Sequence, residues 1–362
     1  MSRSLVYSFS LFILGLLLAG CETTKLSQAE KERLESEKQM RLASMLEEIQ
    51  LAEDDVYNTL HHIFLSAGGI KDEETFGYVG AFFATHHFYP ELLEEALNER
   101  GIDEVITVRY VVPDSPADLA GLEKGDQLMG INGDAIPTRG LRPTKYAMNH
   151  LKKALIPDEP NRLLVRRAGQ EIELEVEPVE AAYYGLIVWP HSEVFAETDG
   201  KMLFLSQSLL EMADDYKQLS YICAYAVAKG VMRHAKMKKS NMSIGSIFDI
   251  AAFVYGINTM GAFENMGRKA HQLAFEVEAD MIALYILANA EIDISEYPAF
   301  WEETLPIYRR DRSLVKMDSE RLGHMRKTIA EIDEKRINGE PIYPTEYLSG
   351  EMDTGEEIEE SS

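Results

Sequence analysis

Cysteine and basic residues are scarce in this sequence of 362 residues. Two cysteines occur, Cys21 and Cys223, and 36 Lys and Arg residues stand against 61 Asp and Glu, a formal net charge of −25. A surface this negative repels phosphate backbones, so no nucleic acid is expected as a partner. Cys223 lies in an apolar run, where a cysteine is more often a small core residue than a nucleophile. The length allows two modest domains with cores of their own.

The N-terminus lacks an apolar run long enough to cross a bilayer. Leu5 to Leu18 is almost wholly apolar, but it is shorter than the roughly 20 residues that a spanning helix needs. Arg3 precedes this run, and Leu18-Ala19-Gly20-Cys21 follows it with the pattern of a lipoprotein cleavage site. We therefore predict that residues 1–20 are a signal peptide and that lipid is attached to Cys21.

Lipid on Cys21 has further consequences. Cys223 then has no partner for an intramolecular disulfide. The lipid would anchor the chain in a membrane, and we expect the chain to lie in a bacterial cell envelope, facing the periplasm. Glu22 follows the lipidated residue, which by resemblance to enterobacterial sorting favours the outer membrane.

Composition divides the mature chain into four parts. Residues 21–74 are rich in Glu, Lys, Gln and Leu and predict a tether with a charged helical segment. Residues 75–179 are β-rich, and Glu171 to Val176 alternates charged and apolar residues as a half-exposed strand does. Residues 180–345 have a mostly helical pattern. Residues 346–362 form an acidic tail that we expect to be disordered.

One further apolar stretch, Met242 to Phe263, raises the question of a second membrane segment. Asp249, Asn258 and three glycines interrupt it. We therefore expect a buried or membrane-facing hairpin rather than a spanning helix.

Several turn and cap signals follow one another within the β-rich part. Ser115 before Pro116 predicts the start of a short helix, Gly121 predicts its end, and Asn132-Gly133 is a strong hairpin signal. The order and spacing of these features resemble a PDZ domain. The resemblance implies a β-barrel of five to six strands that binds an extended peptide by adding it as a strand.

A PDZ domain also needs a loop of backbone N–H groups for the terminal carboxylate of its ligand. Gly77, Tyr78, Val79 and Gly80 precede a strand in the order seen in bacterial HtrA-type PDZ domains, so they are the candidate peptide-binding residues. A strand turn of the neighbouring domain explains the two glycines equally well. The second helix of the PDZ domain is expected at Thr144 to Ala154.

A second resemblance rests on Phe275-Glu276-Val277-Glu278-Ala279-Asp280. This run matches the Glu-x-Glu-Ala-Asp signature of the HtpX/BepA-like zinc metallopeptidases (peptidase family forty-eight), in particular their PDZ-containing lipoproteins. It implies that Glu276 stands at the position of the third zinc ligand and Asp280 at a supporting position. It also implies an α+β chain, with a mostly helical zincin-like domain over residues 180–345 and a small sheet near residues 186–206.

The other zinc ligands of that family are missing. Zinc peptidases with the HExxH motif place two histidines four residues apart on a helix, with the glutamate as general base. Here the motif falls on Tyr225-Ala226-Val227-Ala228-Lys229, so Tyr225 and Lys229 replace the histidines and Ala226 replaces the glutamate. The later Ser-His-Pro element fails as well, at Val315 and Lys316. We therefore predict a pseudopeptidase without catalytic residues and without an expected cofactor.

Lys229 suggests a replacement for the metal. Its ammonium would face Glu276, and we predict an ion pair, shared with Asp280 and hydrogen-bonded by Tyr225, that holds two helices together. The alternative is that Lys229 extends to solvent and other side chains fill the site.

Three hypotheses of function follow. The leading one is a non-catalytic envelope lipoprotein whose PDZ domain binds extended or C-terminal peptides of envelope proteins. Its metallopeptidase-like domain would act as a scaffold or regulator in envelope protein quality control. The alternative is an active zinc metalloendopeptidase with atypical ligands, and zinc would then be its cofactor. The third is a structural tether whose PDZ groove is closed by neighbouring segments of the same chain.

Overall fold

The computed structural model describes residues 28–68, 70, 75–89, 91–136, 151–190, 194–198, 200–240, 268–304, 317 and 319–344. The chain divides into two compact units, Met1–Ser44 and Met45–Ser362. Several predicted features lie outside the described residues, namely the predicted signal peptide with Cys21, the stretch Met242 to Phe263, Val315 with Lys316, and the acidic tail.

Helix α3 (Gln28–Ala67) confirms the helical segment predicted within residues 21–74. In the first unit it carries exposed ion pairs such as Arg33 with Glu37 at 3.4 Å. In the second unit its buried residues recur every three or four positions, which places one buried stripe along the helix. The apolar members of this stripe are Leu46, Ile49, Val56, Tyr57, Leu60, Ile63, Phe64 and Ala67.

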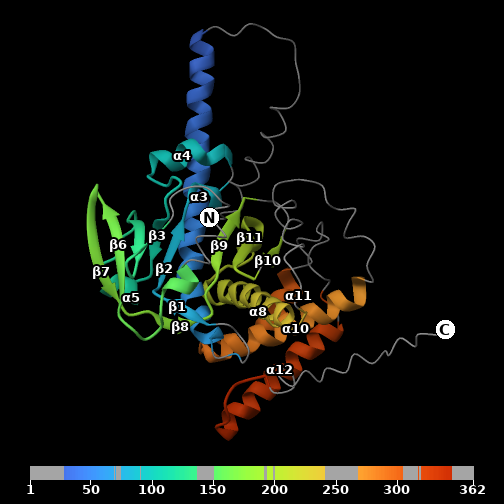
Figure 1. Ribbon diagram of the computed structural model, residues 1–362. Helices are drawn as coiled ribbons and strands as arrows, with labels where there is room; N and C mark the ends of the chain where they lie inside the picture. The colour runs from blue at the N-terminus through green and yellow to red at the C-terminus, as the bar shows by residue number, and fades with distance from the viewer. Residues whose placement is uncertain are drawn as a thin grey trace, which may run out of the picture. The chain divides into compact units, whose positions relative to one another are not determined.

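An antiparallel sheet with PDZ-like features follows α3 in the second unit (Figure 1). Its strands are β2 (Ala81–Ala84), β3 (Thr107–Val111), β4 (Gln127–Ile131), β5 (Asp134–Ala135), β6 (Asn161–Arg167) and β7 (Gln170–Val176). Their order is β2-β3-β4-β6-β7, and β5 pairs with β4. Because β2 and β7 each have one neighbour, the described strands form an open sheet, and the barrel closure that we predicted is not seen.

The predicted local signals of this sheet are confirmed. Ser115 caps α5 (Pro116–Leu119) by accepting a hydrogen bond from Asp118 N at 3.3 Å. Asn132 and Gly133 have φ values of +54° and +89°, which a tight two-residue hairpin turn between β4 and β5 requires. Residues 151–154 are helical, and the rest of the second helix expected at Thr144 to Ala154 lies outside the described residues.

The chain enters and leaves the PDZ-like part at neighbouring places. Strand β1 (Phe76–Tyr78) pairs antiparallel with β8 (Val179–Ala181). Three short elements connect β2 to β3, namely the 3-10 turns η2 (His86–Phe88) and η3 (Glu91–Leu93) and helix α4 (Glu94–Glu99).

A second, small sheet confirms the strands expected near residues 186–206. It consists of β9 (Gly185–Trp189), β10 (Ala196–Thr198) and β11 (Met202–Ser206) in the order β10-β11-β9. Strand β11 is antiparallel to β10 and parallel to β9. Ser206 then caps α7 (Gln207–Leu210) by accepting a hydrogen bond from Leu209 N at 3.2 Å.

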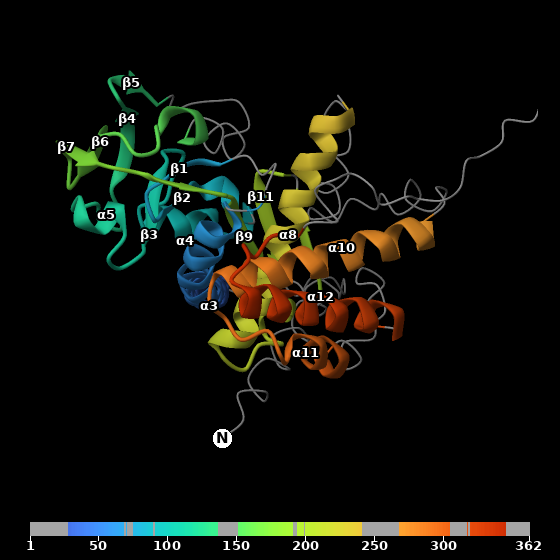
Figure 2. The same cartoon turned by 90° about the horizontal axis from the view of Figure 1, so that it is seen from below.

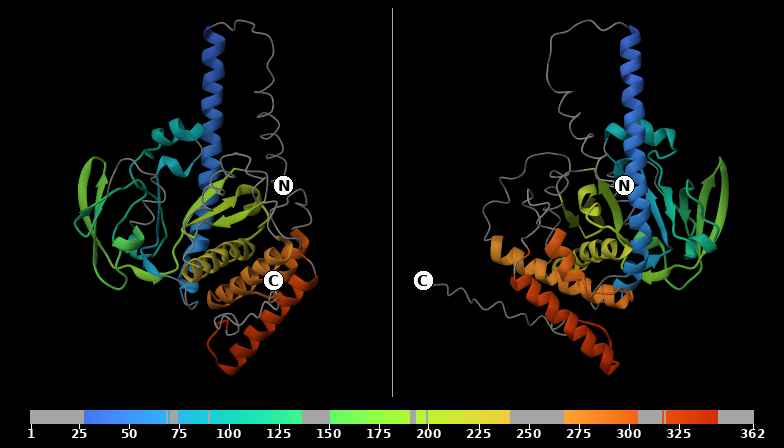
Figure 3. Two further views of the ribbon diagram at one scale, coloured as in Figure 1. Left: turned by 45° about the vertical axis from the view of Figure 1, so that its right-hand side comes forward. Right: turned by 180° about the vertical axis from the view of Figure 1, so that it is seen from behind.

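The residues described after α7 include four further helices: α8 (Tyr216–Ser240), α10 (Arg268–Asn289), α11 (Tyr297–Thr304) and α12 (Ser319–Asn338). Helix α10 packs against both α8 and α12, as Figure 2 shows. Figure 3 shows the same three helices side by side from two further directions. The chain is therefore α+β. Among the helices that the structure describes, none is long and apolar enough to cross a membrane.

Candidate functional site

The candidate carboxylate loop, Gly77 to Gly80, lies between β1 and β2. A Cβ atom on Gly77 would lie 2.5 Å from Leu155 O. Gly80 has a φ of +76°, and a Cβ atom there would overlap Ser115, the residue that caps α5. Both glycines are therefore required by close packing, and Gly80 also by its left-handed backbone.

Hydrogen bonds orient the peptide groups of this loop. Val79 O accepts from Ala117 N, and Gly80 O accepts from Val112 N, each at 2.8 Å. Because a trans peptide unit is planar, its N–H points opposite to its carbonyl. The N–H of Gly80 therefore points away from α5, and the N–H of Ala81 points away from β3, the neighbour of β2 among the described strands. Successive N–H groups beside a left-handed residue are the arrangement that binds a carboxylate.

Helix α3 supports this loop and strand β2 with aromatic side chains. The ring of Tyr57 stacks on Phe82 with centroids 4.0 Å apart, and Phe64 packs edge-on against Tyr78 at 5.8 Å. His61 Nδ1 lies 3.2 Å from the hydroxyl of Tyr78. Burial lowers the pKa of His61 to about 4, so this imidazole is neutral at physiological pH. All four residues of β2 are buried.

A buried ionic cluster also joins α3 to the sheet. Arg109 of β3 is 3.3 Å from the carboxylate of Glu53 and 2.8 Å from that of Asp54, and it donates to Gln50 O at 2.7 Å. Tyr89 donates to Glu53 at 2.8 Å. Burial raises the pKa of Glu53 to about 7, although Arg109 and Tyr89 lower it. This cluster joins the part of α3 within the second unit to the PDZ sheet.

The structure brings together the residues to which the resemblance assigned the positions of a metal motif. Tyr225, Ala226 and Lys229 lie on α8, Glu276 and Asp280 lie on α10, and all five are buried. The hydroxyl of Tyr225 donates to Glu276 Oε2. Burial, together with Glu276, raises the pKa of Tyr225, so the phenol keeps its proton and acts as the donor.

Arg321 of α12 supplies the counter-charge for the two carboxylates. Its guanidinium contacts Asp280 through two hydrogen bonds of 2.5 and 3.1 Å and lies 3.7 Å from Glu276. Tyr297 of α11 donates to Asp280 at 3.1 Å. Burial raises the pKa of Asp280 to about 6, and Arg321 opposes this rise. The carboxylates of Glu276 and Asp280 are thus held in a hydrogen-bonded network from four helices, α8, α10, α11 and α12.

Lys229 has a different partner from the one we predicted. Its ammonium donates to Ala196 O at 2.7 Å and lies 3.3 Å from Glu197 Oε1, both on β10. Burial lowers the pKa of Lys229, but Glu197 and Glu276 raise it by more, so the ammonium stays charged. The predicted ion pair between Lys229 and Glu276 is therefore wrong. Lys229 joins the edge strand β10 to helix α8.

These residues do not fit a zinc ion. A zinc site in a protein uses three or four His, Cys, Asp or Glu ligands. Within the part of the chain that the structure describes, no group of three such side chains is placed to hold a metal. The carboxylate of Glu276 already accepts the hydroxyl of Tyr225 and faces Arg321. Arg321 and Lys229 are cations that would repel a divalent ion.

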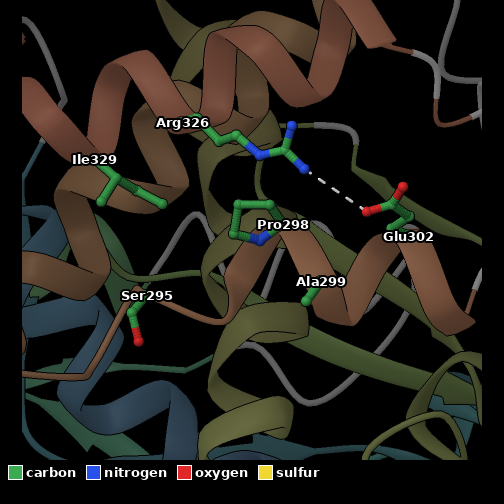
Figure 4. A pocket seen from close by; sticks show the side chains of 6 residues that line it. All are labelled: Ser295, Pro298, Ala299, Glu302, Arg326 and Ile329. Atoms are coloured by element: carbon green, nitrogen blue, oxygen red, sulfur yellow. Dashed lines mark ion pairs between the residues drawn. The ribbon is translucent and has the colours of Figure 1, made fainter.

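A shallow groove of about 280 Å³ lies between α11 and α12 (Figure 4). Its lining residues are Ser295, Pro298, Ala299, Glu302, Arg326 and Ile329. Arg326 and Glu302 form an ion pair of 3.8 Å across it, with side chains 64% and 55% exposed. The groove is therefore an open surface feature that holds no buried polar group.

Sequence reasoning missed the residues that complete both sites. Arg321, Tyr297 and Glu197 come from elements distant in sequence from the motif positions that they contact. Arg109 and Glu53 were not identified either. The one available signal was a charged residue within an otherwise apolar strand or helix face, which does not name its partner.

Residues 107–167 match the PDZ domain family. The chain therefore contains a PDZ domain, as predicted, whereas no metallopeptidase family is found. Among solved structures, "HtrA-type protease AlgW with decapeptide" is 24% identical with a TM-score of 0.23, over 29% of this chain and 30% of that chain. A serine endoprotease from Yersinia pestis is 24% identical with a TM-score of 0.20, over 29% of each chain. The chain thus spans less than a third of either structure's length. No curated protein matches.

Proposed function

We propose that this chain binds extended or C-terminal peptides through its PDZ domain. The orientation of the Gly80 and Ala81 N–H groups carries this proposal. The carbonyls of the same two peptide units accept hydrogen bonds from Ala117 and Val112, so the Gly80 N–H points away from α5 and the Ala81 N–H points to the side of β2 opposite β3. A peptide laid along that side would extend the sheet by one strand, and its terminal carboxylate would meet the two N–H groups.

Selection from a peptide library tests this function. The full chain, purified in detergent, is exposed to random decapeptides displayed with free C-termini, and the strongest binder is resynthesised with a carboxylate and with an amide end. We expect a shared C-terminal residue among the binders. Amidation should weaken binding about tenfold or more, since it removes charge-assisted hydrogen bonds. Equal binding of the two forms would contradict the carboxylate site.

A second candidate function is favoured by one observation. All four residues of β2 are buried, and Tyr57 of α3 covers Phe82. This supports the structural tether, in which the peptide groove is closed by the chain's own segments. If the library yields no binder with the folded chain, the tether replaces peptide binding as the function.

In the peptide-binding proposal, the helical part acts as a scaffold or regulator rather than as a peptidase. The network of Tyr225, Glu276, Asp280 and Arg321 supports this proposal, because each carboxylate already has a protein partner. The alternative is a zinc metalloendopeptidase with atypical ligands. Elemental analysis of the purified chain separates the two. Stoichiometric zinc, with casein cleavage that a chelator stops, would establish the alternative.

The cellular place of this function rests on Cys21. The lipoprotein cleavage-site pattern that ends at Cys21 supports attachment to a bacterial envelope membrane, and Glu22 favours the outer membrane. This location supports a role in envelope protein quality control. Fractionation of cells that express the chain and its Cys21→Ser variant tests this. The variant should leave the membrane fraction, and its retention there would contradict the anchor.

A further inference from the structure

Tyr184 lies in the short connection between β8, the last strand of the PDZ-like part, and β9 of the small sheet. Its side chain is fully buried. The connection is tied to α3, because Ala182 N donates to Phe64 O at 3.2 Å. Tyr184 is therefore held at the junction between the PDZ domain and the helical part of the second unit.

Three elements meet at this ring. The ring of Phe64, on α3, lies 6.1 Å from it, centroid to centroid. The ammonium of Lys152 lies over its face, 4.9 Å from the centroid. Gly230 of α8 faces its edge so closely that a Cβ atom would lie 2.7 Å from Tyr184 Cε1 and Cζ. Only glycine leaves room for the ring at that position of α8.

The Lys152 side of this contact belongs to the peptide-binding part. Residues 151–154 are helical, and the ammonium of Lys152 also lies 4.1 Å from the ring centroid of Phe76, the residue before the carboxylate loop. Leu155 packs its carbonyl against Gly77, the first residue of that loop. Any shift of Tyr184 would therefore displace the 151–155 segment, which packs against the loop.

We propose that Tyr184 is a positioning residue for peptide binding, through which α8 sets the place of the 151–155 segment beside the carboxylate loop. This rests on the proposed function of the PDZ domain. Gly230 follows directly after Lys229, which replaces a zinc-ligating histidine in the motif discussed above. The contact between Gly230 and Tyr184 would therefore give this part of α8 a role that needs no metal. A packed contact of this kind transmits a displacement, since buried side chains have no free space to absorb it.

A double-mutant cycle tests the proposal with the decapeptide selected from the library. Gly230→Ala would push the ring of Tyr184 and should weaken peptide binding about threefold or more. In a Tyr184→Leu background, which removes the ring, the same change should have no further effect. Gly323→Ala is the matched control, because nothing lies within 4 Å of its added methyl group, and it should change binding by less than about twofold.

A second pair of variants approaches the contact from the PDZ side. Lys152→Met removes the charge over the ring and should weaken binding, whereas Lys153→Met, its exposed neighbour, should not. This pair decides the question if Gly230→Ala does not fold. Equal affinities of Gly230→Ala and Gly323→Ala, or independent effects of Gly230→Ala and Tyr184→Leu, would overturn the inference while peptide binding stands. Failure of the unaltered chain to bind any peptide would overturn both.

Discussion

Arg321 and Arg326 lie on the same helix, α12, and each forms an ion pair, but their surroundings differ. The Arg321 side chain is 1% exposed and its partners Asp280 and Glu276 are 1% and 4% exposed. Arg326 is 64% exposed and its partner Glu302 is 55% exposed. The same substitution to methionine at the two positions therefore compares a buried ionic network with a surface ion pair.

The expected magnitudes differ several-fold. Removing one partner of a buried ion pair typically costs about 3–5 kcal/mol, because the other charge stays buried without compensation. An exposed pair contributes only about 0.2–1 kcal/mol. Arg321→Met leaves two buried carboxylates without their counter-charge, so we expect it to lower the free energy of unfolding by at least about 3 kcal/mol. That is a large share of the roughly 5–15 kcal/mol by which domains are stable.

Urea unfolding followed by far-ultraviolet circular dichroism measures both variants. The loss in Arg321→Met should be smaller at about pH 5 than at about pH 8. The reason is that burial already raises the pKa of Asp280 to about 6, and without Arg321 it rises further, so acid neutralises the stranded carboxylate. Asp280→Asn added to Arg321→Met should recover part of the stability. Equal losses for Arg321→Met and Arg326→Met would refute the reasoning.

Three other predictions follow from the same structure. Burial raises the pKa of Glu53 to about 7 and that of Asp280 to about 6, so the folded chain binds protons that the unfolded chain releases. The free energy of unfolding should then fall as the pH rises from about 4 to about 8, on the order of 3 kcal/mol per group, with a flatter curve in Glu53→Gln. Gly80→Ala should abolish peptide binding and destabilise the chain by at least about 1 kcal/mol more than Gly101→Ala. The two glycines have φ values of +76° and +75°, but only at Gly80 would the methyl group overlap a neighbour. Lys229→Met should lower the free energy of unfolding by about 1.5–3 kcal/mol through the lost charged hydrogen bonds to β10, and an unchanged melting temperature would speak against this contact.

The PDZ part shows how far local patterns reach. Ser115, Gly121 and the pair Asn132-Gly133 each act on backbone groups a few residues away, so their effects are visible in the sequence. The glycines of the candidate carboxylate loop were harder to interpret. Gly77 and Gly80 are explained by contacts with Leu155 and Ser115, which are distant in sequence.

The helical part shows where local patterns stop. Family resemblance, not periodicity, pointed to Tyr225, Lys229 and Glu276, and the structure does bring these positions together. The choice of ion-pair partners was wrong, however. Arg321 lies 41 residues from Asp280 and had no local signal. The sequence around Lys229 also cannot show whether its ion-pair partner is Glu276 or Glu197, because both carboxylates are distant in sequence.

The sequence by itself determined the division into a β-rich and a mostly helical part, and the caps and hairpin turn of the PDZ domain. These properties follow from residue types and from interactions between near neighbours in the chain. Only the tertiary structure decided which buried charges pair, that α3 covers β2, and that Tyr184 lies between Lys152 and Gly230. Such choices depend on which groups leave water at the same place, and that is a property of the packed chain rather than of any segment.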